Sequence, residues 1–325
     1  MLLFSAALFA GFLFLIFSAD SFVKGTSAIA RNLGISPLII GLTIVGLGTS
    51  APEMLVAGMA SVQGNTGLAT GNAIGSNIAN IGLVLGTTAL VTPILIQSSL
   101  LKRELPILLA ISIASYLLVI DGDLSQLDGL ILIAGLLAFL YWLLRSAQQN
   151  KQQNTDALAS EFDDEIPTDI SNKAASFYAL VGLVGLIASS KLLVWAAVNI
   201  AIIFGVSDLV IGLTIIAIGT SLPELAASIM SVIKKEPDLA VGNIIGSNAF
   251  NLLAVFCLPG LIHPGPVDAQ LVSRDFPVML SLTLCLFFFS YSFKGKPEIS
   301  RFKGAIFMIF FIAYLSKVYL DTIGI

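Results

Sequence analysis

Two copies of a short motif place a glutamate, a proline and two hydroxyl residues inside long apolar stretches of the chain. The first copy ends in Thr49-Ser50-Ala51-Pro52-Glu53, and the second, 171 positions later, ends in Thr220-Ser221-Leu222-Pro223-Glu224. A carboxylate within a membrane-spanning segment is costly and usually marks an ion pathway. Because proline cannot donate a backbone hydrogen bond, each copy also frees a carbonyl four residues earlier. Carboxylate, hydroxyl and carbonyl oxygens are hard ligands, so the motif favours Na⁺ or Ca²⁺ over softer metals.

A second repeated motif adds amide and hydroxyl oxygens. Asn72, Ser76 and Asn80 are four residues apart and share one helical face, and Asn243, Ser247 and Asn251 repeat that spacing. The accompanying Gly-x-x-x-Gly pairs allow membrane helices to approach closely. Such residues are commonly only packing residues, and a buried glutamate can serve as a structural hydrogen-bonding group. Both motifs are duplicated while the apolar residues around them differ, which favours a shared cation site.

Composition and hydropathy define the class of protein that positions these motifs. Of 325 residues, 57% are apolar and 11% are charged, with a mean hydropathy of +0.97. These values predict an all-α polytopic membrane protein whose partner is the lipid bilayer, and nothing indicates a nucleic acid or an obligate protein partner. Ten spans are expected near 2–22, 37–61, 68–96, 105–120, 126–145, 175–202, 208–233, 239–262, 275–293 and 303–320.

Basic residues predict the orientation of these spans. The odd-numbered connections hold 13 of the 16 lysines and arginines. Cytoplasmic loops carry an excess of such residues, so the odd connections are expected to be cytoplasmic. With ten spans, both termini then lie outside, in a multi-pass protein of the plasma (inner) membrane.

The motifs belong to an internal repeat. Gly34–Val84 aligns with Gly205–Val255 without a gap, with 24 identities over 51 positions. Five spans separate the copies, so the copies are expected to insert in opposite orientations, as in many secondary transporters. We expect two inverted-topology five-helix repeats at 1–145 and 175–325, broken helices at spans 2 and 7, and a cytoplasmic linker at 146–174.

The paired motifs resemble those of the sodium/calcium exchangers of the calcium/cation antiporter superfamily, and the short central connection is similar to that of the prokaryotic branch. The resemblance implies that Glu53, Glu224 and the carbonyls of Thr49 and Thr220 coordinate Ca²⁺. It also implies flanking sodium sites and a central lining. The implied sodium ligands are Ser50, Ser76 and the Gly46 carbonyl on one side and Ser221, Ser247 and the Ala217 carbonyl on the other, with Asn80 and Asn251 lining the centre.

The expected function is antiport of Ca²⁺ against Na⁺ by alternating access, with spans 2, 3, 7 and 8 as a core and spans 1 and 6 moving across it. The resemblance implies three Na⁺ for one Ca²⁺ and therefore electrogenic exchange. Ca²⁺/H⁺ antiport is the nearest alternative, because a buried glutamate can take a proton. A cation channel is less favoured, and an enzyme is disfavoured because there is one histidine and no nucleophile or zinc signature. No cofactor is expected besides the transported ions.

Overall fold

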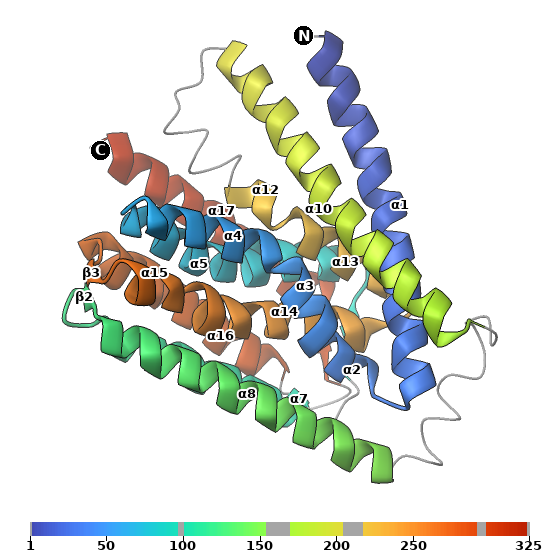
Figure 1. Ribbon diagram of the computed structural model, residues 1–325. Helices are drawn as coiled ribbons and strands as arrows, with labels where there is room; N and C mark the ends of the chain where they lie inside the picture. Colours follow the sequence, from blue (N-terminus) through green and yellow to red (C-terminus); the bar gives the residue numbers. More distant parts are fainter. Residues whose placement is uncertain (1, 97–100, 154–169, 204–216, 291–296, 324–325) are drawn as a thin grey trace.

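The computed structural model describes residues 2–96, 101–153, 170–203, 217–290 and 297–323, and these residues are predominantly helical (Figure 1). Seven helices in this part of the chain are long and apolar enough to cross a membrane, or eight if one bent pair counts as a single span. The predicted all-α membrane class is confirmed, whereas ten spans stay a prediction. Residues 208–216 of the predicted seventh span and 291–293 of the ninth lie outside the described residues.

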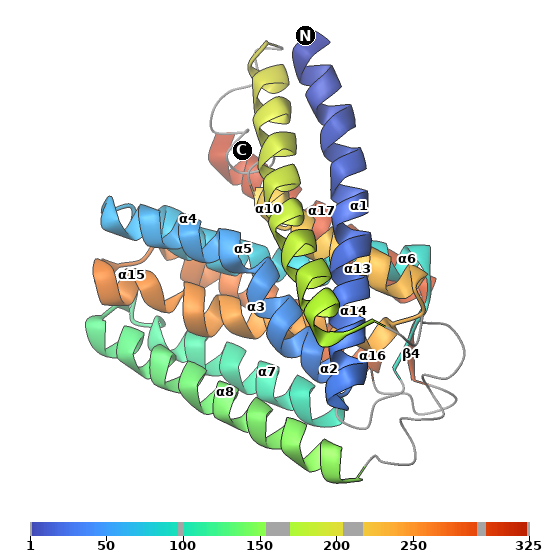
Figure 2. The same ribbon diagram turned by 45° about the vertical axis from the view of Figure 1, so that its right-hand side comes forward.

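Helices α1 (Leu2–Leu33) and α10 (Asn172–Ile203) lie side by side as a pair at one side of the other helices (Figures 1 and 2). Gly11 of α1 packs against Leu193 of α10, and Gly182 of α10 packs against Phe22 of α1. Both partners in the second contact are related to those in the first by the repeat offset of 171. The two helices therefore make one contact twice, with the roles of the repeats exchanged.

The first helix is longer than predicted, because it continues past residue 22 to Leu33. Its end is set by Gly34, whose φ of 63° lies in the left-handed region that glycine adopts at helix ends. The backbone N–H of Ile35 then donates to the carbonyl of Ala30 at 2.9 Å, which closes the last turn.

The chain breaks its helix at each glutamate motif, as predicted. The first copy comprises α2 (Pro37–Ile40), η1 (Gly41–Val45), α3 (Gly46–Thr49) and α4 (Ala51–Val62), and the axis bends by 42° before α4. The second comprises α12 (Ala217–Thr220) and α13 (Leu222–Ile233). The residue at each break is a serine, Ser50 or Ser221, with ψ near 0°. A proline follows two residues later and suits the first turn of the new helix.

The two polar motifs lie on the helices at the centre of the molecule. The first runs through α5 (Thr66–Ala79), η2 (Asn80–Leu85) and α6 (Gly86–Val91), and the second through α14 (Pro237–Phe250), η4 (Asn251–Val255) and α15 (Cys257–Ile262). Each helix widens into a π-helical turn that begins at the last asparagine of its motif. Such turns are frequent at functional sites.

The remaining elements surround this centre. They are α7 (Leu101–Leu118), α8 (Gln126–Gln153), η5 (Leu271–Asp275), α16 (Phe276–Ser290) and α17 (Arg301–Ile323), with strands β1 (Ile94–Leu95), β2 (Asp123–Leu124), β3 (Gly265–Pro266) and β4 (Glu298–Ile299). Antiparallel pairs join β1 to β4 and β2 to β3. Helix α17 packs against α6, and α8 packs against α15, so the last helix of each copy contacts the other copy.

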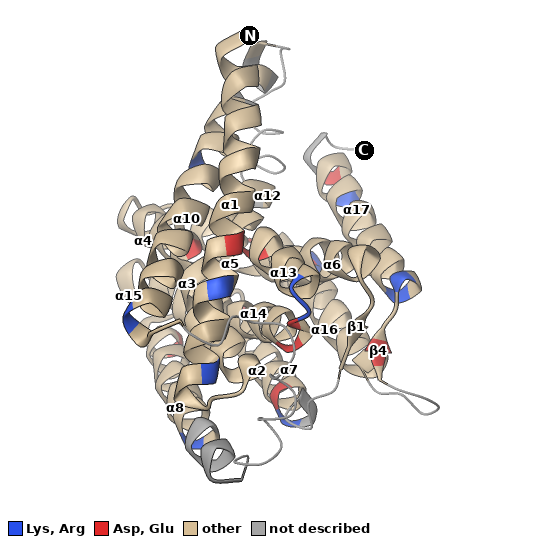
Figure 3. Ribbon diagram, turned by 90° about the vertical axis from the view of Figure 1, so that its right-hand side faces the viewer, with Lys and Arg blue, Asp and Glu red and all other residues tan. Residues whose placement is uncertain are grey.

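Two sequence expectations on the periphery can be compared with the structure. Helix α8 continues to Gln153, into the segment 146–174 predicted to be a linker, and residues 154–169 of that segment lie outside the described part of the chain. Charged residues are sparse along the helices (Figure 3), as the composition requires.

Candidate cation site

Each broken helix contacts both polar helices. Its second half, α4 or α13, packs against the polar helix of its own copy, α5 or α14. Its first half crosses to the other copy, because α2, η1 and α3 pack on α14 while α12 packs on α5. The four motifs are thereby brought together at the centre of the molecule, which the chain order alone does not reveal.

Glycines make this crossing possible on the α14 side. A Cβ on Gly46 would lie 2.9 Å from the Ser247 backbone nitrogen, and one on Gly246 would lie 2.6 Å from the Leu42 carbonyl oxygen. The close approach predicted from the Gly-x-x-x-Gly spacing is therefore present at α14. At Gly71 and Gly75 of α5, no heavy atom of the described residues lies within 4 Å of the corresponding position.

The two motif glutamates, one from each repeat, are fully buried. Glu53 and Glu224 are both 0% exposed, and neither carboxylate has a hydrogen-bond partner within the described chain. An uncompensated buried charge costs several kcal/mol, on the order of 3–5 when one partner of a pair is missing. Cations or protons could neutralise the pair.

The side chains around the carboxylates repeat the same pattern in both copies. The hydroxyls of Ser50 and Ser221 and the amides of Asn80 and Asn251 are buried and have no partner among residues that the structure describes. Buried polar groups in native proteins are nearly always hydrogen-bonded, so a matched set of exceptions indicates ligands. Ser76 and Ser247 are buried nearby on the same helical faces.

Two asparagines fix the glutamates in place, although the sequence did not identify them as site residues. The side-chain amide of Asn72 donates to the Glu53 carbonyl at 3.2 Å, and that of Asn243 donates to the Glu224 carbonyl at 3.3 Å. Asn243 also donates to Ser228 at 2.9 Å. Each bond ties a glutamate-bearing half-helix to the polar helix of its own copy. The signal was available, since both asparagines occupy equivalent positions on the predicted polar faces.

One flank of the site is a closed network of oxygen atoms. Ser247 donates to the Gly46 carbonyl at 3.3 Å and lies 3.2 Å from the Thr49 hydroxyl. The Thr49 hydroxyl, which carries one proton, lies 3.1 Å from Asn243 Oδ1 and 3.0 Å from the Val45 carbonyl, and it can donate to either oxygen. These five groups supply two hydroxyls, two carbonyls and one amide oxygen, and each lies within hydrogen-bond distance of at least one other.

This network regroups the predicted sodium ligands. Ser247 was expected with the Ala217 carbonyl, and Gly46 was expected with Ser50 and Ser76, but Ser247 contacts Gly46. The physical reason is the crossing of the first half-helix to the other copy. On the opposite flank, α12 packs on α5, which carries Ser76. Thr220 is half-buried there, and the side chain of Ala217 lies outside the described set.

The two approaches to the site are unequal. Gly242, Asn243 and Gly246 are buried beneath the first half of the broken helix. Their equivalents in α5 are more open, because Gly71 is exposed and Asn72 is half-buried. Because α14 begins directly after Lys234 and Lys235, the sealed approach lies on the side of the molecule that carries these lysines.

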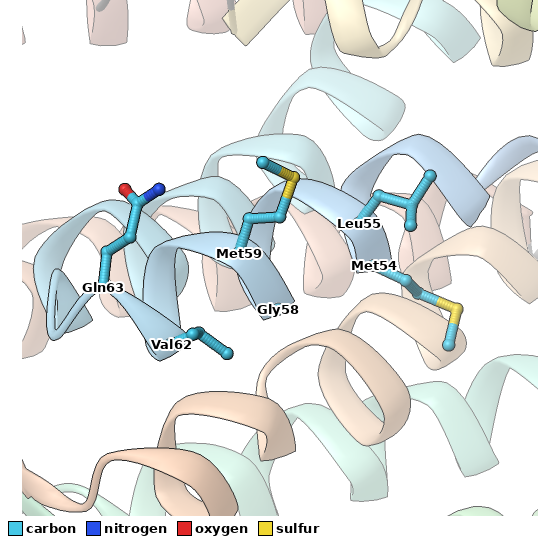
Figure 4. A pocket seen from close by; sticks show the side chains of 6 residues that line it. All are labelled: Met54, Leu55, Gly58, Met59, Val62 and Gln63. Atoms are coloured by element: carbon cyan, nitrogen blue, oxygen red, sulfur yellow. The ribbon is translucent and has the colours of Figure 1, made fainter.

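A depression on α4 is separate from this site. It has a volume of about 420 Å³ and is lined by Met54, Leu55, Gly58, Met59, Val62 and Gln63 (Figure 4). Leu55, Met59 and Val62 are 57%, 64% and 75% exposed. An apolar exposed surface of this kind suits lipid contact and offers few cation ligands.

Fold and site together define a multi-pass membrane antiporter for cations, including Ca²⁺. The chain belongs to the sodium/calcium exchanger protein family, whose family model matches residues 4–145 and 175–320. It is 48% identical to the putative antiporter CaxA of Alkalimonas amylolytica, over 94% of this chain and 95% of that protein. It is 30% identical to the sodium/calcium exchanger MaX1 of Methanosarcina acetivorans, over 94% and 95% of the two chains.

Similarity extends to an inner membrane protein and to solved structures. The chain is 41% identical to the inner membrane protein YrbG of Escherichia coli K12 over 98% of both chains. A structure of the sodium-calcium exchanger NCX_Mj soaked with Na⁺ and Ca²⁺ matches with a TM-score of 0.82 and 30% identity, covering 97% of this chain and 98% of that chain. The resemblance inferred from the motifs is confirmed.

Proposed function

We propose that this protein exchanges Na⁺ for Ca²⁺ across the inner membrane, with three Na⁺ for each Ca²⁺. The observation that carries the proposal is the pair of buried carboxylates, Glu53 and Glu224, whose oxygens have no partner within the described residues. One Ca²⁺ neutralises two carboxylates, and the carbonyls of Thr49 and Thr220 add hard oxygen ligands at the helix breaks.

The regrouped flanks are the proposed sodium sites. On one flank the ligands are the Gly46 carbonyl, Thr49 and Ser247, which already lie within hydrogen-bond distance of one another. By repeat symmetry, the other flank uses Ala217, Thr220 and Ser76. Ser50 and Ser221 at the breaks and Asn80 and Asn251 at the π-helical turns complete the lining. Asn251 is neutral, so the centre carries two carboxylates.

Alternating access follows from the inverted repeat in this proposal. Ten spans form two five-helix repeats at 1–145 and 175–325 around the 146–174 connection, with both termini outside. The reciprocal contacts of Gly11 and Gly182, and of α8 and α17, support an inverted relationship between the copies. The pair α1–α10 moves across a core made of the broken and polar helices.

The decisive experiment is ⁴⁵Ca²⁺ uptake into proteoliposomes with and without an opposing Na⁺ gradient. Uptake that requires internal Na⁺ supports the proposal. Uptake driven by a pH gradient without Na⁺ would instead establish Ca²⁺/H⁺ antiport, in which protons neutralise the two carboxylates. Flux that needs no counter-ion on the opposite side would indicate a channel.

Stoichiometry has its own test. With three Na⁺ for one Ca²⁺, each cycle moves one charge, and a membrane potential contributes about 2.3 kcal/mol per 100 mV. Vesicle potential is set with K⁺ and valinomycin while the Na⁺ and Ca²⁺ gradients are held constant. A reversal point that ignores voltage would mean two Na⁺ per Ca²⁺.

A further inference from the structure

Among the polar contacts between the α1–α10 pair and the core, two lie close to the break of the second glutamate helix or at its end. Asp20 of α1 forms an ion pair with Lys234, at the end of α13, at 2.7 Å. The buried Ser190 of α10 donates to the carbonyl of Gly219 at 2.6 Å. Pro223 lies four residues after Gly219 and has no backbone N–H, so the Gly219 carbonyl lacks the usual helical hydrogen bond from the residue four positions later. Ser190 therefore satisfies and positions a carbonyl at the break of the ion-site helix.

Neither contact has a counterpart in the other repeat. At the offset of 171, Ser190 corresponds to Ala19 and Gly219 corresponds to Gly48, so the donor is missing. Likewise Asp20 corresponds to Lys191 and Lys234 corresponds to Gln63, so the opposite charges are missing. The offset is valid in this region, since the Gly11–Leu193 and Gly182–Phe22 contacts obey it.

In a transporter with inverted repeats, the two access states arise when the repeats exchange conformations. A contact that has a repeat counterpart is lost on one side and remade on the other, so it favours neither state. A contact without a counterpart is lost and not replaced. We propose that Ser190–Gly219 and Asp20–Lys234 hold the α1–α10 pair on the core and bias the protein toward the state sealed on the Lys234 side. This inference rests on the proposed alternating access.

The size of the bias follows from the kind of contact. A net hydrogen bond corresponds to a population ratio of about two- to tenfold. An ion pair contributes less when it is exposed, and Lys234 and Asp20 are 30% and 50% exposed, so up to about fivefold is expected. When the site opens to one side only in the minor state, the apparent Ca²⁺ affinity on that side is lower than the intrinsic affinity, in proportion to the population of that state. Weakening the bias therefore raises apparent affinity on the Lys234 side alone.

The test is ⁴⁵Ca²⁺/Ca²⁺ self-exchange in proteoliposomes of one orientation, with Ca²⁺ varied on one side and saturating on the other. Ser190→Ala and Asp20→Asn should lower the half-saturating Ca²⁺ concentration on the Lys234 side by about two- to tenfold and up to about fivefold. The value on the opposite side should change little. A variant that only loses stability would lower the maximal rate and leave both half-saturation values unchanged.

Two matched controls use the same chemistry, one in α10 itself and one in α17. Ser189→Ala removes a buried hydroxyl that donates at 2.7 Å to the Gly185 carbonyl within α10. Lys317→Gln breaks an ion pair with Asp321 within α17 at 2.6 Å. Neither should shift half-saturation on one side only. If the controls shift it as the test variants do, or if the test variants shift both sides equally, the inference is overturned.

Two additions test the same idea in the opposite sense. Ala19→Ser supplies the missing donor to the Gly48 carbonyl, and Gln63→Glu supplies the missing charge opposite Lys191. In the proposal, these added contacts form only in the other access state and stabilise it. Each should lower half-saturation on the Lys234 side, as the deletions do, and an absence of any shift would contradict the inference. Because self-exchange uses Ca²⁺ alone, a failure of the proposed Na⁺ coupling would be seen separately in the gradient experiment.

Discussion

The same substitution in the two Gly-x-x-x-Gly motifs should have different consequences. A Cβ on Gly246 would lie 2.6 Å from the Leu42 carbonyl oxygen and 2.8 Å from the Leu42 Cα, whereas ordinary contacts exceed 3.4 Å. The obstructing atoms are backbone, so no rotamer change can relieve them. Over-packing of this kind costs about 1–3 kcal/mol. At Gly75, the equivalent position in α5, no described atom lies within 4 Å.

Gly246→Ala should therefore lower the temperature at which half of the purified protein loses its monodisperse peak by roughly 2–10 °C. Gly75→Ala should lower that temperature less, because no described backbone atom obstructs the added methyl group. In Gly246→Ala, the displaced segment carries Gly46 and Thr49, so Na⁺-driven Ca²⁺ flux should also fall. Equal destabilisation by the two variants, or none by Gly246→Ala, would refute the unequal packing of the two approaches.

Three further predictions follow from the site, the topology and the loops. Glu53→Gln and Glu224→Gln should each abolish Ca²⁺ exchange while still inserting, because neutralising a buried charge removes an insertion cost; exchange near the wild-type rate in either variant would contradict the shared site. A single cysteine near Lys234 should resist impermeant thiol reagents added outside cells while one near Gly64 reacts, and the reverse pattern would invert the topology. Burial raises the pKa of Glu236 to about 7, although the positive charge of Arg31 acts in the opposite direction. The folded state therefore holds the proton more tightly than the unfolded state, so the contribution of Glu236 to the free energy of unfolding is full below about pH 4.5 and is lost as pH rises through about 7. Glu236→Gln should flatten this part of the pH–stability profile, and an unchanged profile would remove Glu236 as its cause.

Much of the candidate site was predictable because its chemistry is duplicated. An alignment of 51 positions with 24 identities identified the glutamates, serines and asparagines that the structure buries without partners. The helix break at Ser50 follows from the motif itself, since proline two residues later cannot continue the helix. The full length of α1 was missed, because its C-terminal third mixes Gly, Ser, Thr and charged residues with apolar ones and carries a weak hydropathy signal.

The grouping of the ligands could not be predicted. The resemblance implied that Gly46 lies with Ser50 and Ser76, whereas the fold places its carbonyl within hydrogen-bond distance of Ser247, about 200 residues away. Nothing in a one-dimensional pattern states which polar helix each half of a broken helix will contact. That choice depends on the crossing of backbones at Gly46 and Gly246, where the absence of Cβ atoms permits a close approach.

The sequence by itself determined the class of protein, the repeat and the set of candidate oxygen ligands, because hydropathy, residue type and spacing are properties of the chain. Tertiary structure alone decided which repeat completes each flank, which approach is sealed, and which contacts lack a counterpart. Asp20 illustrates the difference, since its sequence context indicates no role, while the fold pairs it with Lys234 at 2.7 Å. In the sequence, symmetry means that the same residues stand at equivalent positions of the two repeats. In the structure, a contact such as Asp20–Lys234 is made by residues that have no matching pair in the other repeat.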